Sequence, residues 1–487
     1  MEQLSALDNL FLNMETGTTP MHVGSLAIYD TSTVPEGELT FKAVMKNLEA
    51  RLHKAPMMRY RHVPVALGID YPYWIADPDF DIEFHVRHIA LPKPGDWRQL
   101  CIQFARLHAR PLDMNRPPWE MYVIEGIDNV DGVPEGGMAI VLKAHHALVD
   151  GASGMQLMAA LHDLTPARSI TKYSEPWIVD RVPNQIELIS RAGWNGMRRI
   201  AKRGSVMTRY ARPLLGGLSR CLTKTSTCNL MKAPRTRFNG KVSPHRVFEA
   251  MSFDLKLVKM VKNSQPKVTI NDVMMAVVSG GLRRYLKRKG ELPDESLTAM
   301  VPVNIDPTRN DQKGATQGNH LSFMFPRIFT SEADPLERLR AINKANRAAK
   351  RTREDLGGQE LMDAASLMPS TVTNLLMRSA VKYKLAGHIK PLFNTIITNV
   401  PGPQFPVYHT GAKLQKFFGA GLSYDTAGLF HVIFSYNGVI TISITCCRKM
   451  MPDPEMYMDC LKQSWKELLA AIPQSHPQEE RMATTEE

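Results

Sequence analysis

The residues best suited to chemistry lie in one short stretch, KAHHALVDGASG, at positions 143–154. Two adjacent histidines, His145 and His146, are followed by Asp150 and Gly151. Such side chains can bind a metal ion, activate a nucleophile, act as a general base, or form a buried structural cluster. Each of these four roles makes its own demand on the neighbouring sequence.

A metal site and a catalytic serine both require neighbours that this stretch lacks. Adjacent side chains on a strand point to opposite faces, so His145 and His146 do not converge on one ion. Histidines paired at the i, i+4 spacing of helical zinc sites are absent from the sequence. A serine hydrolase would need Gly-x-Ser-x-Gly, and Ser153 in GASGM does not fit that pattern. We therefore expect neither a metal nor a covalent acyl-serine.

A buried structural histidine pair, with Asp150 capping the next helix, remains an alternative. The position of the pair favours catalysis, because it ends an apolar strand and precedes a glycine-rich helix start, where α/β folds place chemistry. One histidine can then face a cavity while the other packs. A lone histidine base suits acyl transfer from a thioester to an alcohol, in which the substrate supplies the nucleophile. Gly151 allows a ligand to approach the backbone closely.

The elements around this stretch alternate between strands and helices in two blocks of similar size. The first block contains strands at 21–30, 121–127 and 137–144, and helices from 40, 98 and 152. The second contains helices at 271–288 and 334–353, strands at 298–304, 395–403, 430–438 and 439–447, and a last helix ending near 472. This pattern predicts an α/β fold. The expected divisions are a domain at 1–180, a basic connector at 181–245, a domain at 246–475 and a disordered tail at 476–487.

The composition is that of an ordinary globular protein. The 487 residues are 44% hydrophobic and 22% charged, and the mean hydropathy is -0.23. No apolar run approaches the roughly 18 residues of a membrane span, and the N-terminus lacks the basic start of a signal peptide. Six cysteines without zinc spacing indicate reduced thiols and a cytoplasmic protein.

Most of the net charge of +12 lies in one segment. Residues 186–246 contain 14 Lys or Arg and one acid, Glu187. Basic residues alternate there with apolar ones such as Trp194 and Met197. Such a segment can lie on a membrane surface, or it can be a crossover helix with solvated cations. Nucleic acid is not expected as a partner, because no binding motif accompanies the charge.

Motifs along the whole chain resemble those of one enzyme family. HHALVDG matches the H-H-x-x-x-D-G motif of coenzyme A-dependent acyltransferases of the chloramphenicol acetyltransferase (CAT) fold and of peptide-synthetase condensation domains. LSALDNLFLNMETGTTPMHVGSLAIYD and PLDMNRPPWEMYVIEG come before it, and INDVMMAVVSGGLRRYL, VPVN, GNHLSFMFPRI, TNVPGP and GAGLSYDTAGLFHVIFSYNGVITISI come after it, in that order. Together they resemble the bacterial wax ester synthase/diacylglycerol acyltransferase family over about residues 4–472.

The resemblance implies a cofactor-free enzyme with two CAT-like domains and an active-site tunnel between them. Acyl-CoA would donate a long-chain acyl group to a long-chain alcohol, giving a wax ester, or to diacylglycerol, giving triacylglycerol. The enzyme would be cytoplasmic, or peripheral at the inner membrane face or at lipid inclusions. A condensation-type enzyme with a carrier-bound acyl group and a non-catalytic lipid-droplet binding protein are the alternatives.

The resemblance also implies roles for individual residues. His146 would be the general base, with His145 and Asp150 in support and Gly151 near the oxyanion. Asn271 and Asp272 match a further family motif and would bind substrate, although Asn271 also fits a helix N-cap. Two departures from the family are Pro117-Pro118-Trp119, where many members have Pro-Leu-Trp, and the cysteines Cys446 and Cys447. Asn399, in TNVPGP, would either begin a turn or contact substrate.

Overall fold

The structure is a computed structural model of the 487-residue chain. It describes residues 1–34, 39–149, 151–167, 179, 181–198, 233–304, 321–356, 371, 374–375, 379 and 390–472. Asp150, most of the basic connector and the whole 476–487 tail lie outside the described residues.

The first of two large sheets carries the histidine pair. In order across this sheet, the strands are β12 (Tyr408–His409), β13 (Ala412–Ala420), β2 (His22–Asp30), β7 (Gly137–His145), β6 (Trp119–Ile127) and β5 (Val86–Ala90). Neighbours are antiparallel except β5 and β6, which are parallel. His22 lies opposite His145 and Tyr29 opposite Met138, so the paired histidines end the central strand pair.

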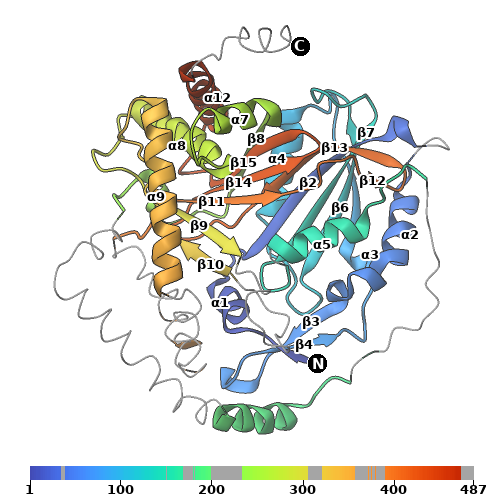
Figure 1. The fold of residues 1–487 in the computed structure, drawn as a ribbon. Coiled ribbons are helices and arrows are strands. Elements are labelled where there is room, and N and C mark those ends of the chain that lie inside the picture. Colours follow the sequence, from blue (N-terminus) through green and yellow to red (C-terminus); the bar gives the residue numbers. More distant parts are fainter. Residues whose placement is uncertain are drawn as a thin grey trace, which may run out of the picture.

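The second sheet is built from the other half of the chain. Its strands in order are β10 (Leu321–Met324), β9 (Ala299–Asn304), β11 (Thr395–Pro401), β14 (Leu429–Tyr436), β15 (Val439–Cys447) and β8 (Arg246–Asp254). The central strands β9, β11 and β14 are parallel, and the outer pairs are antiparallel. The predicted α/β fold is confirmed, with mixed rather than purely parallel sheets (Figure 1).

One strand of the first sheet comes from the second half of the sequence. β13 pairs antiparallel with β2, from Lys413 opposite Asp30 to Ala420 opposite Gly24. The division at residue 246 assigned all of 246–475 to the second domain. The observed pairing instead places residues 408–420 in the first sheet, because the chain crosses back before forming β14.

Hydroxyl groups join β13 to the second sheet as well. On β15, Thr441 donates to the carbonyl of Phe417 at 3.3 Å, and Ser443 donates to that of Gly419 at 2.6 Å. The amide of Gly421 donates to Thr445 at 3.2 Å. Thr441, Ser443 and Thr445 alternate along β15 and therefore share one face. All three are buried, so these bonds form where water cannot replace them.

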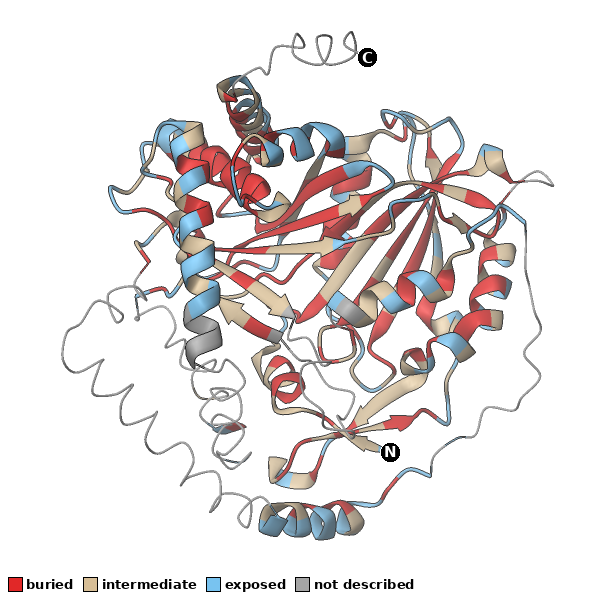
Figure 2. Cartoon of the chain, viewed as in Figure 1, coloured by how far each residue is buried: buried red, intermediate tan, exposed pale blue. Residues whose placement is uncertain are grey.

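Helices cover the outer faces of both sheets (Figure 1). On the first sheet, α2 (Phe41–Arg51) and α5 (Gly151–Leu161) cover one face and α4 (Trp97–His108) covers the other. The second sheet packs against α8 (Ile270–Arg288), with α9 (Pro335–Leu356) and α12 (Pro454–Ala471) beside it. Figure 2 shows the central strands largely buried, while α9 presents exposed residues on its outer side. Two further helices are α3 (Ile82–His85) and α7 (Leu255–Asn263).

An N-terminal helix lies against the second sheet. Helix α1 (Ala6–Met14) begins with a capping box in which Ser5 and Asp8 exchange hydrogen bonds. Its buried residues Leu7 and Phe11 pack with Phe430 of β14. A small sheet of β1 (Glu2–Gln3), β4 (Tyr73–Ala76) and β3 (Tyr60–Val63) lies beside it.

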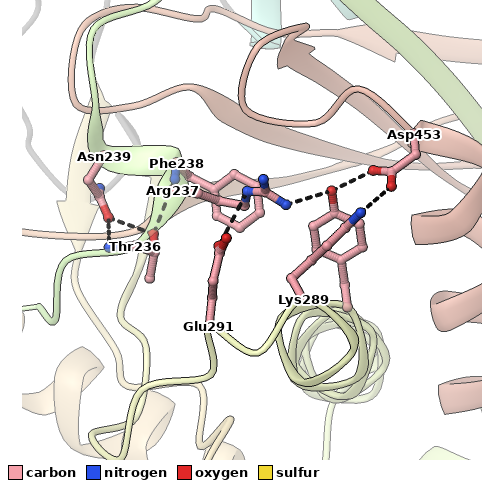
Figure 3. A network of polar contacts seen from close by, with 8 residues as sticks. Thr236, Arg237, Phe238, Asn239, Lys289, Glu291 and Asp453 are labelled. Atoms are coloured by element: carbon pink, nitrogen blue, oxygen red, sulfur yellow. Dashed lines mark hydrogen bonds and ion pairs between the residues drawn. The ribbon is translucent and has the colours of Figure 1, made fainter.

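The last part of the connector, described from residue 233, packs against the end of α8. Arg237 lies 3.4 Å from Glu291 and donates to the hydroxyl of Tyr285 at 3.3 Å (Figure 3). Asp453 accepts from Tyr285 at 2.7 Å and from Lys289. Burial alone would raise the pKa of Asp453, but these hydrogen bonds outweigh it and lower the pKa. The network ties α8 to the start of α12.

No helix among the described residues is long and apolar enough to span a membrane.

The hydroxyl contacts between β15 and β13 predict a stability effect. Ser443→Ala should lower the free energy of unfolding by about 1–3 kcal/mol, because the buried carbonyl of Gly419 loses its donor. Ser464 on α12 is equally buried, and its hydroxyl has no partner among the described residues. Ser464→Ala should therefore be neutral or stabilising. Urea unfolding measures both changes, and equal losses in the two variants would contradict the role of the Ser443 contact.

Candidate active site

A cavity of about 890 Å³ lies between the two sheets. Strands β2 and β7 and helix α5 line it from the first half of the chain, and strands β9, β11 and β14 line it from the second. Helix α1 and strand β13 also line it, with single residues from other elements such as α8 and β12. Most of the lining is apolar, and the volume is in the range of known ligand sites.

His146 lines this cavity. It is the first residue after β7, and its backbone amide donates to the carbonyl of Met21 at 2.8 Å. Its imidazole stacks on the ring of Phe11, with centroids 4.3 Å apart and planes inclined by 19°. Strand pairing therefore fixes the backbone of His146 from one side, and α1 orients its ring from another.

His145 is fully buried and points away from the cavity wall that His146 forms. Its Nδ1 accepts from the amide of Ala147 at 3.1 Å, so the proton of the neutral ring is on Nε2. That Nε2 lies 3.1 Å from the Glu15 carboxylate, although out of line for a good hydrogen bond. His145 thus stabilises the turn after β7, the turn that contains His146.

Buried, neutral histidines surround His145. Burial and the nearby His108 and Lys143 hold the pKa of His22 well below its usual range. Burial, with a smaller contribution from His145, lowers the pKa of His62 to about 4. Burial also lowers the pKa of His108 to about 4. This side of the histidine pair is therefore a neutral, closely packed support.

Gly151 is the first residue of α5 and lines the cavity. A Cβ atom there would come no closer than 4.0 Å to Val400 on β11. The N-terminus of α5 therefore lies close to the end of β11. Asp150, expected to support the histidines, lies outside the described residues.

Asn271 and Asp272 occupy different environments. Asn271 lines the cavity, whereas Asp272 forms a capping box with Thr269, the actual N-cap of α8. The Asp272 carboxylate also accepts from Asn343 at 2.9 Å and from Asn346 at 2.6 Å, both on α9. Asp272 therefore caps α8 and joins it to α9, and the proposed site does not include it.

Asn399 lies within β11 rather than at a turn, and its side chain lines the cavity. Its amide lies 3.4 Å from the Asn271 carbonyl oxygen, which it can reach as a weak donor. The two asparagines supply polar groups from the second half of the chain to a wall that is otherwise largely apolar.

Phe11, within α1, contacts His146, and Glu15, directly after α1, contacts His145; neither was predicted as a site residue. A signal was present: Ser5 and Asp8 have capping-box spacing, and Leu7, Leu10, Phe11 and Met14 share a helical face.

The two departures from the family pattern lie in packed regions. The carbonyl of Pro118 accepts from the amide of His145 at 2.9 Å, and the indole of Trp119 donates to Met58 at 2.5 Å. Cys446 and Cys447 are buried free thiols in the core of the second sheet. Among the described residues, no group of three or more His, Cys, Asp or Glu could hold a metal ion.

Comparison with known proteins agrees with this geometry. Residues 4–274 match the wax ester synthase/diacylglycerol acyltransferase catalytic domain, and residues 317–469 match the WS/DGAT C-terminal domain. A putative diacylglycerol O-acyltransferase of Mycobacterium tuberculosis is 34% identical over 96% of this chain and 90% of its own. O-acyltransferase WSD of Acinetobacter baylyi is 30% identical over 93% of both chains.

Solved structures show the same fold. The wax ester synthase/diacylglycerol acyltransferase of Marinobacter aquaeolei matches with a TM-score of 0.67 and 26% identity, covering 96% of this chain and 98% of that one. Trichothecene 15-O-acetyltransferase of Fusarium sporotrichioides matches in fold alone, with a TM-score of 0.59 and 11% identity over 96% of this chain and 94% of that one.

Two sheets that enclose a cavity with a histidine at a strand end define a CAT-like acyltransferase. This chain belongs to the wax ester synthase/diacylglycerol acyltransferase family.

The neutral histidines behind His145 predict an acid-labile fold. The unfolded chain protonates histidine near pH 6.5, whereas folded His62 stays neutral to about pH 4. The unfolded state therefore binds more protons in this window, and stability falls as the pH falls from 6.5 towards 4. Each such histidine contributes a slope of up to roughly 1.4 kcal/mol per pH unit.

His62→Gln should reduce this slope by up to roughly 1.4 kcal/mol per pH unit, because one fewer histidine takes up a proton on unfolding. Urea unfolding between pH 7 and pH 4.5 measures it in the parent and the variant. An identical pH dependence in both proteins would contradict the neutral state of His62.

Proposed function

We propose that this enzyme transfers a long-chain acyl group from acyl-CoA to a hydroxyl group of a long-chain alcohol or diacylglycerol. The observation that carries the proposal is the placement of His146 in the wall of one long apolar cavity between the sheets. Both substrates would meet there in a ternary complex, with no covalent acyl-enzyme. The reaction needs no cofactor, because the thioester itself activates the acyl group.

His146 acts as the general base in this proposal. It takes the proton of the acceptor hydroxyl as the oxygen attacks the thioester carbonyl, and the proton then goes to the leaving thiolate. Proton transfer by a positioned histidine contributes about 10²–10⁴ in rate. Stacking on Phe11 and the turn stabilised by His145 hold the imidazole in place.

The oxyanion forms opposite the base, between the N-terminus of α5 and β11. Amides in the first turn of a helix are free to donate, and the helix dipole favours negative charge there. Gly151 and the side-chain amides of Asn399 and Asn271 line the same cavity. These groups support an oxyanion in a largely apolar wall, where electrostatic stabilisation is strong.

Direct transfer is favoured over a cysteine acyl-enzyme. Within the described part of the chain, none of the four free cysteines lines the cavity. Burial raises the pKa of Cys101 and Cys446 well above the usual value, so neither forms a ready nucleophile. The alternatives are an enzyme with a carrier-bound acyl donor and a lipid-binding protein without catalysis. An activity that depends on acyl-CoA and on His146 would distinguish the proposed enzyme from both.

We also propose peripheral contact with anionic lipid through the helical residues 185–198. Leu188 and Ala192 pack on the small sheet, while Ile186, Trp194 and Met197 are exposed on the opposite face. Arg191 and Arg198 flank the exposed face. Apolar side chains with basic neighbours suit the interface of a lipid surface.

His146→Ala should lower the alcohol-dependent rate by about 10²–10⁴, because the hydroxyl loses its base. Purified enzyme is given hexadecanoyl-CoA with hexadecanol, or with diacylglycerol in parallel, and free thiol is followed over time. His245→Ala, at an exposed histidine outside the cavity, is the control and should retain activity. Thiol release that ignores the alcohol or survives in His146→Ala would contradict the mechanism.

The double variant Ile186→Glu/Met197→Glu should bind anionic vesicles about tenfold more weakly or worse, because two apolar contacts become repulsive carboxylates. Co-sedimentation with phosphatidylglycerol/phosphatidylcholine vesicles measures the change. Val439→Glu places one charge on an exposed apolar residue of β15 and should bind as the parent does. Unchanged binding of the double variant would exclude this helix as the lipid contact.

A further inference from the structure

The cavity continues along the first sheet to a point far from His146. His22 lies opposite His145 and Tyr29 opposite Met138, seven positions further along the same strand pair. At roughly 3.3 Å per residue, this separates the two ends by about 23 Å. His146 and Tyr29 both line the one cavity, so an extended long chain can run from one end to the other.

The wall between these ends is mostly apolar. Val23 and Ala27 on β2 and Leu142 and Ile140 on β7 share the face that α5 covers, because alternate residues of a strand point the same way. Met155 of α5 closes this part of the cavity from the other side. Ser25, between Val23 and Ala27 on the same face of β2, also lines the cavity, so a hydrocarbon chain meets an apolar wall with one hydroxyl in it.

Three polar rings close the far end of the cavity. Tyr29 near the end of β2, His162 directly after α5 and His409 of β12 all line it. Their ring centroids are 5.7–5.9 Å apart in each of the three pairings. The three rings therefore form a compact cluster, here called the ring cluster.

The hydrogen bonds of the ring cluster have definite directions. His162 Nδ1 donates to the carbonyl of Met158 at 2.7 Å, because a carbonyl only accepts. His162 Nε2 is then bare and accepts from the Tyr29 hydroxyl at 2.8 Å. The lone pairs of the Tyr29 oxygen remain available on the cavity side.

His409 adds a second open position. Its Nδ1 lies 3.1 Å from the Thr410 hydroxyl, while its Nε2 has no hydrogen-bond partner among the described residues. The side chain is only 2% exposed, so bulk water does not satisfy this nitrogen. A buried polar atom without a partner is costly, which points to a ligand group that supplies one.

The ring cluster stays neutral and rigid. Burial lowers the pKa of His162 to about 4 and, together with the nearby His162, that of His409 to about 3. Asp163, next to His162, pairs with the buried Arg51 at 2.5 Å and exchanges backbone hydrogen bonds with Tyr408, next to His409. The neighbours of both histidines are thus fixed to one another.

We propose that the ring cluster binds a hydroxyl group at the far end of a substrate chain, so that the enzyme prefers long chains oxygenated away from the reacting carbon. A hydroxyl both donates and accepts: when His409 Nε2 carries the proton, the hydroxyl accepts from it and donates to the Tyr29 oxygen, and when that nitrogen is bare, the hydroxyl donates to it instead. A plain chain of equal length leaves these positions unpaired. The inference rests on the proposed acyl transfer, and it applies to whichever chain, acyl or alcohol, occupies this branch.

The test compares chains that differ only at the terminal carbon. In the donor arm, the CoA thioesters of hexadecanoic, octadecanoic and icosanoic acids are compared with their terminally hydroxylated counterparts, with hexadecanol as acceptor. In the acceptor arm, the plain alcohols are compared with the corresponding terminal diols, corrected for their two reacting hydroxyls. The readout is the ratio of kcat/KM for the hydroxylated chain to that for the plain chain.

In the parent enzyme this ratio should reach about ten in one arm, as expected for one or two hydrogen bonds. It should fall towards one in His409→Phe and, with only one atom removed, in Tyr29→Phe. Met14→Leu, in the α1 part of the same cavity, should leave the ratio unchanged whatever it does to the rate.

A ratio of one or less in both arms for the parent overturns the proposal, as does a high ratio that persists in both ring variants. The plain substrates test acyl transfer by themselves, so failure of the general function shows as no alcohol-dependent turnover. In that event, equilibrium dialysis of the free plain and hydroxylated fatty acids decides the inference, and equal affinities overturn it.

Discussion

Three hydroxyl groups on β15 hold the two sheets together by hydrogen-bonding to the backbone of β13 and of Gly421 directly after it. The second half of the chain contributes β13 to the first sheet. β13 also pairs with β2, so its backbone forms hydrogen bonds to both sheets. This contact between β13 and β15 is called the seam here, and Phe417, Gly419 and Ala420 of β13 line the cavity. A shift of one sheet against the other would therefore disturb the seam and the cavity together.

The seam also requires close approach of two strands. A Cβ atom at Gly419 would lie 2.6 Å from Val432, and one at Gly421 would lie 2.2 Å from the ring of Phe430. Only glycine fits there, and this lets Val432 and Phe430 of β14 reach the cavity wall. The same approach places β11 near the N-terminus of α5, where the proposed oxyanion forms.

Much of the site could be predicted from local sequence, because its signals are local. The strand before His145 and the helix after Gly151 are continuous patterns, and their junction marks a strand end. Most predicted strands of the second half were likewise confirmed within a few residues, as at Thr395–Pro401. What local pattern could not supply was pairing: nothing in residues 412–420 indicates that they leave one half of the chain to join β2. The importance of α1 was also missed, since a helix of nine residues shows little until its partners Phe430 and His146 are known.

The adjacent histidines depend on both halves of the molecule through α1. Alternation along β7 sends His145 into the packed interior and leaves His146 at the cavity. Glu15 lies against the first and Phe11 stacks on the second, so α1 and the residue after it contact both rings. Since Leu7 and Phe11 of this helix pack on β14 of the second sheet, the position of the proposed base is set by the same sheet that lines the other side of the cavity. Correct assembly of the halves is therefore a condition for orienting His146, in addition to enclosing the substrates.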